Sequence, residues 1–274
     1  SIRRRIPLGL LTRDCINNYQ RVFIARNVPP RTYNYFHEEP EASEVSISFR
    51  IVGGNEINIE KAPYAVLYGN YCGGSLIAPE WVLTAAHYRY KFVLAGATKT
   101  TESTSYPICA HFFHPRWTAS NKKNYHDWDY QLLLLEKAVP YTKSSMPIAI
   151  GRAEDIVPGS FVAVSGWGYI AKPSHRKMQT ILRQVLVPVI SQENCLAIPN
   201  QYYQAVTPRM FCAGYSKGRE DACQGDSGGP AVYNNRLVGL VSYGLGCAEP
   251  GHPGVYTRVP VARPWIREIT GLPL

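Results

Sequence analysis

A serine between glycine-rich turns is the residue of this sequence best suited to nucleophilic chemistry. Ser227 lies in the segment from Asp221 to Pro230, which reads Asp-Ala-Cys-Gln-Gly-Asp-Ser-Gly-Gly-Pro. A serine hydroxyl is a weak nucleophile until a base takes its proton. Glycines on both sides let the backbone turn tightly, and backbone N–H groups beside the serine can stabilise a developing oxyanion. The segment therefore predicts a nucleophile at Ser227, if a base lies beside it.

The best candidate for that base is His87. It ends the stretch Leu-Thr-Ala-Ala-His, which follows the apolar run Trp81–Leu83. The small residues before it fit close packing against a neighbouring strand. We interpret the other histidines as surface or satisfied core residues; they are His37, His111, His114, His126, His175 and His252.

A histidine base needs a carboxylate to orient it, and Asp129 has the right setting. It opens the stretch Asp-Tyr-Gln-Leu-Leu-Leu-Leu. An acid at the start of a strongly apolar strand is costly to bury unless it is hydrogen-bonded, and a histidine Nδ1–H meets that need. Asp127 is the competing acid, but it lies in the polar stretch 121–128, which we interpret as a loop.

The elements that position these residues are predicted to be short strands. From Ile51 onward, apolar runs recur between turn residues, and their spacing fits β-barrels. Two sets, separated near Pro147, predict two barrels, and apolar residues at helical spacing between Val261 and Ile269 predict a C-terminal helix. The predicted strands are Ala65–Leu67, Ser75–Ile77, Trp81–Thr84, Phe92–Leu94, Leu132–Leu135, Phe161–Val164, Ile181–Val187, Ala231–Tyr233, Leu237–Ser242 and Gly254–Val259.

Length and composition are those of a globular protein. The chain has 274 residues, 45% of them hydrophobic, a net charge of +9 and seven cysteines. No run of eighteen apolar residues occurs, so the sequence predicts no membrane span. Residues 1–50 differ from the rest, with eight arginines and no lysine, and we interpret them as a poorly ordered or loosely docked extension.

With these residues in view, the chain resembles the trypsin-like (chymotrypsin-fold) serine proteases. The resemblance implies an all-β fold of two six-stranded antiparallel β-barrels with a C-terminal α-helix, preceded by a loosely ordered propeptide. It implies a propeptide over 1–50, a first barrel over 51–147, and a second barrel with the helix over 148–274. The motifs that carry it follow the family's order: Ile51-Val-Gly-Gly54, Cys72-Gly-Gly-Ser-Leu-Ile77, Thr84-Ala-Ala-His87, Asp129 with its leucine run, Ser165-Gly-Trp-Gly168, Cys223-Gln-Gly-Asp-Ser-Gly-Gly-Pro230, Val241-Ser-Tyr-Gly244 and Pro253-Gly-Val-Tyr256.

The resemblance also implies the roles of the catalytic residues. Ser227 attacks the scissile carbonyl, His87 takes its proton and returns it to the leaving amine, and Asp129 fixes the tautomer of His87. The backbone N–H groups of Gly225 and Ser227 resemble the oxyanion hole. We therefore expect a serine endopeptidase.

Cleavage after arginine or lysine is the specificity that the resemblance implies. Asp221, six residues before Ser227, matches the acid at the base of the specificity pocket, and Gly244 and Gly254 match its walls. A buried carboxylate makes a charge-assisted pair with a guanidinium or an ammonium group. Ala222 replaces a serine that many trypsins carry, which favours arginine.

The family's catalytic domain is released from a precursor by cleavage just before Ile-Val-Gly-Gly. Here Arg50 precedes Ile51, so the resemblance implies cleavage after Arg50. The freed Ile51 amine is then expected to pair with Asp226 and to order the oxyanion hole and the pocket. Because Arg50 suits the enzyme's own inferred specificity, we also expect some self-activation.

The cysteines depart from the family pattern at one point. Tyr88 replaces the cysteine that is expected to bridge to Cys72. The resemblance implies the pairs Cys195–Cys212 and Cys223–Cys247. Two arrangements stay open for the rest: a Cys15–Cys109 bridge that tethers the propeptide after cleavage, which we favour slightly, and a Cys72–Cys109 bridge.

Other properties are expected to follow the family. We expect no cofactor and no metal site. The segment Gly96–Pro107 is shorter than the family's calcium loop, and Glu102 alone cannot supply the six or more oxygens of a calcium site. We expect a secreted, extracellular monomer that acts on protein or peptide substrates and is open to protein protease inhibitors, without nucleic-acid or membrane partners. The alternative function is a basic, protease-like binding protein with incidental activity, suggested by the net charge and by Arg3-Arg4-Arg5.

Overall fold

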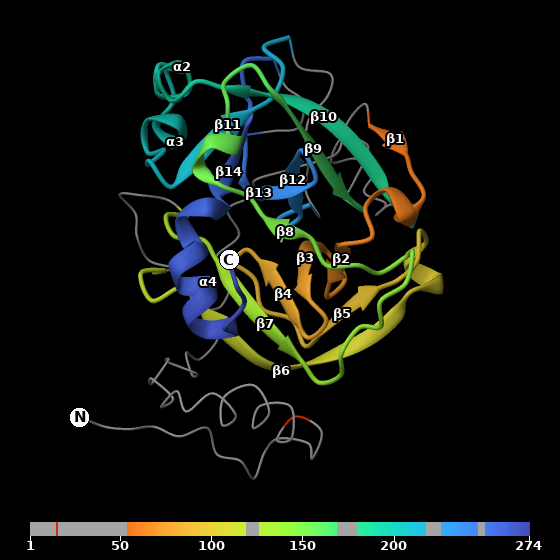
Figure 1. The fold of residues 1–274 in the computed structure, drawn as a ribbon. Coiled ribbons are helices and arrows are strands. Elements are labelled where there is room, and N and C mark those ends of the chain that lie inside the picture. Colours follow the sequence, from red (N-terminus) through yellow and green to blue (C-terminus); the bar gives the residue numbers. More distant parts are fainter. Residues whose placement is uncertain (1–14, 16–53, 119–125, 169–179, 218–225, 246–249) are drawn as a thin grey trace, which may run out of the picture.

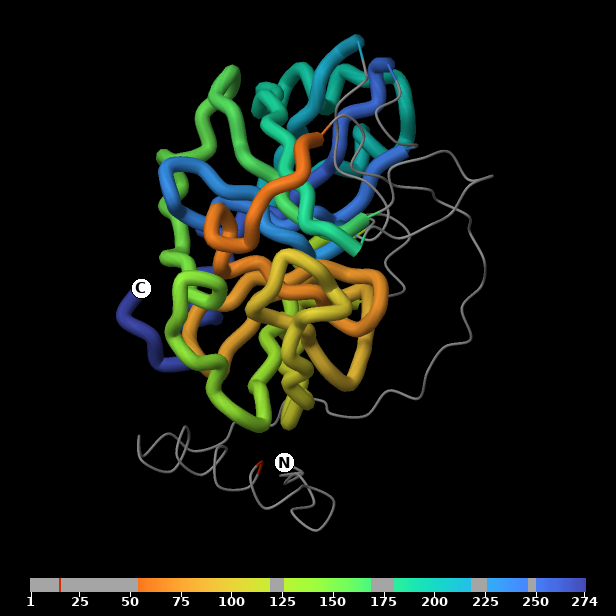
Figure 2. Tube along the Cα trace, turned by 90° about the vertical axis from the view of Figure 1, so that its right-hand side faces the viewer, coloured from red at the N-terminus to blue at the C-terminus, as the bar shows by residue number. Residues whose placement is uncertain are grey.

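The computed structural model describes residue 15 and residues 54–118, 126–168, 180–217, 226–245 and 250–274. Two β-barrels lie one above the other, with the C-terminal helix beside them (Figure 1). A view turned by 90° shows the same two-part arrangement (Figure 2). The strands of the first barrel lie in one body, and the later strands lie in the other together with the earlier segment Asn55–Glu56.

The first barrel contains six antiparallel strands and is closed. The order around it is β2-β3-β4-β7-β6-β5. Strand β7 is buried along its whole length, which explains its unbroken leucine run. It pairs with β4 so that Thr84 lies opposite Gln131, which sets the ends of the two strands side by side. The strands are β2 (Ala65–Tyr68), β3 (Cys72–Ala78), β4 (Trp81–Thr84), β5 (Phe92–Ala95), β6 (Thr104–Phe113) and β7 (Gln131–Leu135).

The second barrel also has six strands, and it closes because β9 pairs with both β10 and β12. In β10, Val185, Val187 and Val189 are buried and alternate with less buried residues, as expected of a strand with one face in a core. The strands are β9 (Phe161–Gly166), β10 (Arg183–Ile190), β11 (Met210–Ala213), β12 (Pro230–Tyr233), β13 (Arg236–Tyr243) and β14 (Gly254–Arg258).

Two short strands extend this second sheet. Strand β1 (Asn55–Glu56) pairs with β10, although it precedes the first barrel in the chain. Strand β8 (Ala149–Ile150) pairs in parallel with β13. The expected domain boundary at 147/148 falls between β7 and β8.

The described helices are short. Helix α4 (Arg263–Thr270) begins with Pro264 in its first turn and ends at Gly271, whose φ of 67° is the left-handed conformation that commonly stops a helix. The others are α2 (Gln192–Leu196), α3 (Gln201–Gln204) and the 3₁₀ turns η2 (Ile59–Lys61), η3 (Thr100–Glu102), η4 (Ala153–Asp155) and η6 (Val259–Ala262). No described helix is long and apolar enough to cross a membrane.

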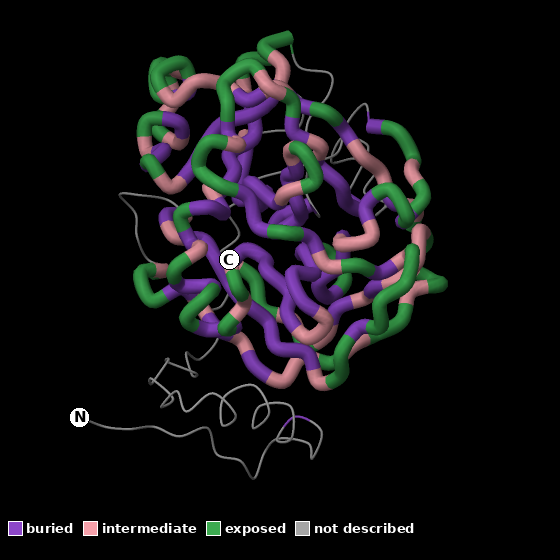
Figure 3. Tube along the Cα trace, in the orientation of Figure 1, coloured by how far each residue is buried: buried purple, intermediate pink, exposed green. Residues whose placement is uncertain are grey.

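A shared apolar core joins the two barrels and α4. Buried residues run through the centre of the molecule (Figure 3). Helix α4 packs against both barrels at once, so burial of its apolar face fixes their relative position. The shared cluster includes Trp81, Leu132 and Leu134 from the first barrel, Val232, Leu237 and Leu240 from the second, and Trp265, Ile266 and Ile269 from α4.

The predicted two-barrel fold and C-terminal helix are confirmed. Strands β6 and β11 and helices α2 and α3 were not among the predicted elements. The expected propeptide, 1–50, lies outside the described residues except for Cys15.

The contact of α4 with the shared core is testable by truncation of one side chain. The change Ile266→Ala removes a fully buried side chain, so we expect it to lower the free energy of unfolding by about 2–5 kcal/mol. Val261→Ala, at a partly exposed position in η6, is the matched control and should cost less than about 0.5 kcal/mol. Urea denaturation of both variants measures the difference; equal effects would contradict this role for α4.

Candidate active site

The carboxylate of Asp129 is fully buried and accepts four hydrogen bonds. Oδ1 accepts the backbone N–H of Ala86 at 2.6 Å and that of His87 at 3.1 Å. Oδ2 accepts Nδ1–H of His87 at 2.7 Å and the hydroxyl of Ser242 at 2.6 Å. Burial alone raises the pKa of Asp129, but the His87 imidazole and the hydrogen bonds lower it below its ordinary value. The carboxylate is therefore ionised and fixed in place.

His87 is presented to Asp129 by the ends of two paired strands. It follows β4 by three residues, and Asp129 precedes β7 by two, so the β4–β7 pairing brings them together. With Nδ1 donating to the carboxylate, the lone pair of the neutral ring is on Nε2. Nε2 is thus the nitrogen able to take a proton from a nucleophile.

Ser227 comes from the second barrel, and its turn packs against the end of β4. The backbone N–H of Gly73 donates to the Ser227 carbonyl oxygen at 2.8 Å. Gly228 has a φ of +80°, and a Cβ on it would collide with Thr84 Oγ1 and the Gly73 carbonyl oxygen, so only glycine fits. The nucleophile candidate therefore lies beside the strand that leads to His87.

No hydrogen bond joins the Ser227 hydroxyl to His87, two residues that the structure describes. Such bonds are often long in an enzyme without substrate and tighten when substrate binds. The structure thus brings the three predicted catalytic residues to one junction between the barrels, with the acid–base half already paired.

Asp226 lies in the interior, next to Ser227. It is fully buried, and its Oδ1 accepts the backbone N–H of Gly168 at 3.2 Å. A Cβ on Gly166 would collide with the same oxygen, which explains the glycine at that position. The segment Ser165–Gly168 is therefore shaped around this carboxylate.

The predicted pocket walls are at the edge of the second barrel. Gly244 follows β13, and Gly254 begins β14. The hydroxyl of Tyr203 in α3 donates to the carbonyl oxygen of Pro253 at 2.9 Å, which ties α3 to the start of β14. The remaining predicted site residues lie outside the described residues: Arg50, Ile51, Asp221, Ala222 and Gly225.

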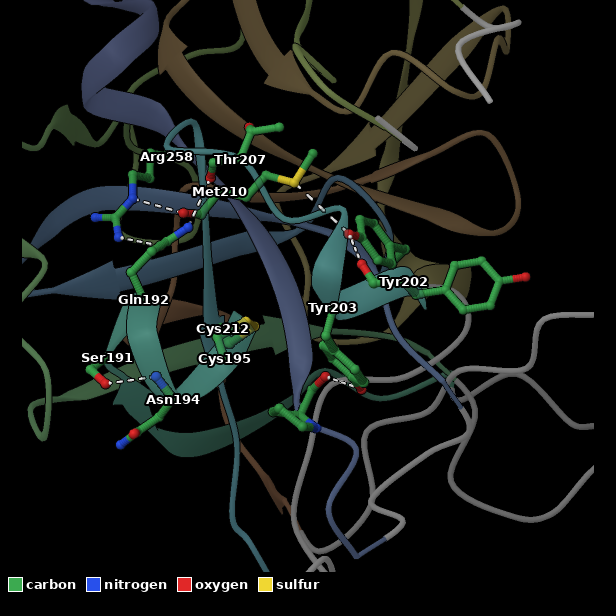
Figure 4. Close-up of a disulfide and its surroundings, with 12 residues drawn as sticks. Ser191, Gln192, Asn194, Cys195, Tyr202, Tyr203, Thr207, Met210, Cys212 and Arg258 are labelled. Carbon is green, nitrogen blue, oxygen red and sulfur yellow. Dashed lines mark hydrogen bonds between the residues drawn. A yellow bond between two sulfur atoms is a disulfide. The ribbon is translucent and has the colours of Figure 1, made fainter. Parts of the chain in front are cut away.

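Two disulfides are described. Cys195 bonds to Cys212 and joins α2 to β11 (Figure 4). Cys15 bonds to Cys109 on β6, which leaves Cys72 as a buried free thiol. Cys223 and Cys247 lie outside the described residues. The 94-residue separation of Cys15 and Cys109 encloses the Arg50–Ile51 bond.

His126 is a site residue that sequence reasoning missed. Its ring stacks on that of His87 with centroids 4.4 Å apart, and its Nδ1 lies 3.6 Å from Asp129 Oδ2. Burial, with a smaller contribution from His87, lowers the pKa of His126 to about 3, so its ring is neutral. The sequence interpretation of His126, a surface or satisfied core residue, did not anticipate its place beside His87.

Asp127, the competing acid, is held away from His87 by an ion pair. Its Oδ2 lies 2.6 Å from Arg209 Nη2, and its Oδ1 accepts Arg209 Nε–H at 3.1 Å and the Thr207 hydroxyl at 2.9 Å. The Arg209 guanidinium also lies 5.3 Å from the centre of the Trp128 ring. Since Arg209 directly precedes β11, this contact ties the segment before Asp129 to the second barrel.

Comparison with known proteins agrees with this geometry. The solved structure of neuropsin, a serine protease from mouse brain, superposes with a TM-score of 0.73 at 30% identity, covering 80% of this chain and 99% of that one. Trypsin 5G1 of Aedes aegypti is 39% identical over 239 residues, or 82% of this chain and 86% of that protein. Human transmembrane protease serine 5 is 39% identical over 243 residues, 81% of this chain, which spans about half of its length.

The family assignment follows from these matches. The family model described as Trypsin matches residues 51–266, which include every described candidate residue of the site. The chain belongs to the trypsin family of serine proteases. Its relatives imply that its substrates are proteins.

The ion pair between Asp127 and Arg209 gives a first prediction for the site. Arg209→Leu leaves a buried carboxylate without its cation, so we expect a loss of about 2–4 kcal/mol in the free energy of unfolding. Lys99→Leu, which breaks the exposed pair with Glu102, is the matched control and should cost less than about 1 kcal/mol. Urea denaturation compares the two, and equal losses would show that the Arg209 pair does not clamp the barrels.

Buried histidines give a second prediction, on pH. Burial lowers the pKa of His111 and of His126 to about 3 and that of His114 to about 4, from an ordinary value of 6.5. Below pH 6.5 the unfolded chain binds these protons and the folded chain does not, so the free energy of unfolding decreases as the pH is lowered. Asp129, with its lowered pKa, adds to the loss only at lower pH, below its ordinary value of 3.8.

We therefore expect the free energy of unfolding to decrease by at least about 1 kcal/mol between pH 6.5 and pH 4. Urea denaturation across this range measures it. In His114→Phe, which keeps an aromatic ring against Trp128, the uptake on unfolding should fall by about one proton. A stability that is flat with pH, or an unchanged slope in the variant, would contradict the assignment of neutral buried histidines.

Proposed function

We propose that this chain is the precursor of a secreted serine endopeptidase that is activated by cleavage after Arg50 and hydrolyses peptide bonds after arginine, and less readily after lysine. The observation that carries the proposal is the 2.7 Å contact of His87 Nδ1 with the buried carboxylate of Asp129, beside the turn that holds Ser227. Membership of the trypsin family supports it.

The proposed mechanism uses these residues in the order that holds for the serine-protease triad. Ser227 Oγ attacks the scissile carbonyl carbon while His87 Nε2 takes the hydroxyl proton, which leaves a tetrahedral oxyanion. Asp129 stabilises the resulting imidazolium through Nδ1–H. The oxyanion then collapses, the C–N bond breaks as His87 gives the proton to the leaving amine, and the acyl group stays on Ser227. In the second half, water attacks the acyl carbon as His87 takes its proton, and Ser227 Oγ leaves with that proton to release the acid.

Substrate selection is assigned to Asp221, Gly244 and Gly254. A carboxylate at the base of a pocket with small walls pairs with the charged end of an arginine or lysine side chain. With Ala222 beside it, the pocket lacks a hydroxyl that could hold lysine. Among the described residues, one contact supports the position of this pocket wall. The Tyr203 hydroxyl donates a hydrogen bond to the carbonyl oxygen of Pro253, the residue before Gly254.

Activation is assigned to the new amino group of Ile51. Asp226 is fully buried, and a buried carboxylate is stabilised strongly by a cation. Pairing of the Ile51 amine with Asp226 would order the adjacent Ser227 turn and the N–H groups of Gly225 and Ser227. The gain in activity on cleavage comes from this ordering.

The Cys15–Cys109 bond gives the activated enzyme two chains. Because the bonded cysteines flank Arg50 and Ile51, cleavage between these residues leaves the segment 1–50 covalently attached to β6. Disulfides persist in oxidising compartments, which supports secretion. The proposed enzyme is a monomer that meets protein substrates and protein inhibitors outside the cell.

Cleavage of the purified precursor with trypsin tests activation and specificity together. We expect a new amino terminus at Ile51, turnover of arginyl peptides with lysyl peptides slower, and a 1–50 fragment released only by reductant. The same cleavage of Ser227→Ala should give the new terminus without turnover. Slow self-cleavage should occur in the precursor but not in Ser227→Ala.

Three results would contradict the proposal. They are arginyl turnover that Ser227→Ala retains, cleavage after Arg50 that leaves activity unchanged, and a peptide-library profile without basic residues on the acyl side. Tight retention on heparin together with hydrolysis unaffected by Ser227→Ala would instead favour the basic binding protein.

A further inference from the structure

Gln131 contacts the turn that carries His87 from inside the first barrel. It is fully buried at the start of β7, opposite Thr84 at the end of β4. The end of its side-chain amide lies 3.1 Å from the backbone carbonyl oxygens of Ala85 and Tyr88. Because carbonyl oxygens only accept, the amide faces them with its NH₂ group, which has one hydrogen for each. One buried side chain thus holds the backbone before and after His87.

Asp129 holds the same turn through groups of the opposite kind. It accepts the backbone N–H groups of Ala86 and His87, whereas Gln131 donates to the carbonyl oxygens on either side of them. Asp129 and Gln131 stand two positions apart where the chain enters β7, and alternate side chains along a strand face the same side. A buried carbonyl oxygen that loses its donor is costly, so the turn is bound to Gln131 as well as to Asp129.

His111 on β6 fixes which way the Gln131 amide points. The pairing of β6 with β7 places His111 diagonally across from Gln131. With the NH₂ group on the turn, the amide oxygen accepts Nδ1–H of His111 at 2.9 Å. Burial, with a smaller contribution from Arg89, lowers the pKa of His111 to about 3, so the ring is neutral and has a single N–H to donate. This donor keeps the amide oxygen turned away from the two carbonyl groups.

Tyr68 holds the chain just after the turn. Its hydroxyl accepts the backbone N–H of Tyr90 at 2.8 Å and lies 3.5 Å from the carbonyl oxygen of Tyr88. Tyr88 replaces the cysteine that was expected to bridge to Cys72, and Cys72 is a free thiol. The described contacts of the segment Ala85–Tyr90 with β2 and β7 are therefore hydrogen bonds where a covalent bridge was expected.

We propose that Gln131 and His111 are positioning residues for the catalytic base, and that their hydrogen bonds take the place of the missing bridge. Gln131 holds the backbone on both sides of His87, and His111 holds Gln131. Since Gln131 is fully buried, it acts on the reaction through the position of His87 between Asp129 and Ser227. Loss of either hydrogen bond should therefore slow the chemical step and leave substrate binding almost unchanged.

The position of His87 can be measured without activity. Proton NMR of the full-length Ser227→Ala precursor should show the Nδ1–H of His87 far downfield, because a carboxylate accepts it at 2.7 Å. Absence of the signal in His87→Gln assigns it. In Gln131→Met, which keeps the chain length but cannot donate, the signal should broaden or vanish through exchange with water. Gln192→Met, which removes a similar bond to the Thr207 carbonyl oxygen, is the matched control and should keep it.

His111 gives a second pair of variants, with opposite expectations. In His111→Asn, the side-chain amide nitrogen can take the place of Nδ1 and donate to Gln131, so the downfield signal should be kept. His111→Leu fills similar space without a donor and should lose the signal. Urea denaturation of every variant shows that it is folded, and the NMR comparison is made only among folded variants.

Turnover is measured on the enzyme cleaved after Arg50 with an arginyl peptide, and this part rests on the proposed function. In Gln131→Met and His111→Leu, kcat should fall roughly tenfold to a hundredfold, the scale expected for a misplaced catalytic group. KM should change by less than about twofold in both. His111→Asn should recover most of the kcat, and Gln192→Met should keep that of the parent.

The outcomes separate the two proposals. An unchanged signal or an unchanged kcat in folded Gln131→Met would overturn the positioning role, as would equal losses in His111→Asn and His111→Leu. If Gln131→Met does not fold, the two His111 variants decide. If the signal responds as expected but no arginyl peptide is cleaved even by the parent enzyme, the positioning role stands and the proposed specificity fails.

Discussion

The buried carboxylate of Asp129 is the constraint on which the rest of the structure depends. A fully buried charge is costly unless it is compensated, and four donors compensate this one. Two of these donors are backbone N–H groups of the turn after β4, so the same contacts that stabilise the charge also fix where His87 stands. A third is the hydroxyl of Ser242 on β13, which draws the second barrel to the same point.

The junction between the barrels is therefore more than an apolar contact. The shared core around α4 supplies burial, while the Asp127–Arg209 pair and the Ser242–Asp129 hydrogen bond each join the first barrel to the second through charge. Breaking a buried charged contact costs more than its formation contributes, because an uncompensated charge is left behind. Such contacts resist sliding of the barrels past each other, which matters because Ser227 and His87 come from different barrels.

Much of this architecture could be predicted from sequence. Strands such as β7 and β13 are mostly apolar runs bounded by turn residues, and the Ser227 segment has a composition that few other roles explain. Strand β6 could not be predicted, because Pro107 and its mixed, half-buried side chains interrupt any alternation. Helices α2 and α3 have five and four residues, too few to show a helical period.

The partners of individual side chains were beyond the sequence for a different reason. The ion pair of Asp127 with Arg209 and the stacking of His126 on His87 depend on where long-range pairing places the ends of strands. Position 126 has a left-handed backbone with φ of 57°, which no local pattern predicts for a histidine. The sequence shows where a histidine stands in the chain, but only the folded structure determines which side chains it contacts.

The most direct test of this account is the turnover of an arginyl peptide by Asp129→Asn after cleavage at Arg50. The asparagine side chain is nearly isosteric but, if its amide donates to His87, it holds the wrong tautomer of the ring. The account predicts a fall in kcat of about 10⁴-fold at neutral pH, the size established for the serine-protease triad, with the fold retained. A fall of less than about tenfold in a folded variant would contradict it, because Asp129 would then not be what makes His87 a base.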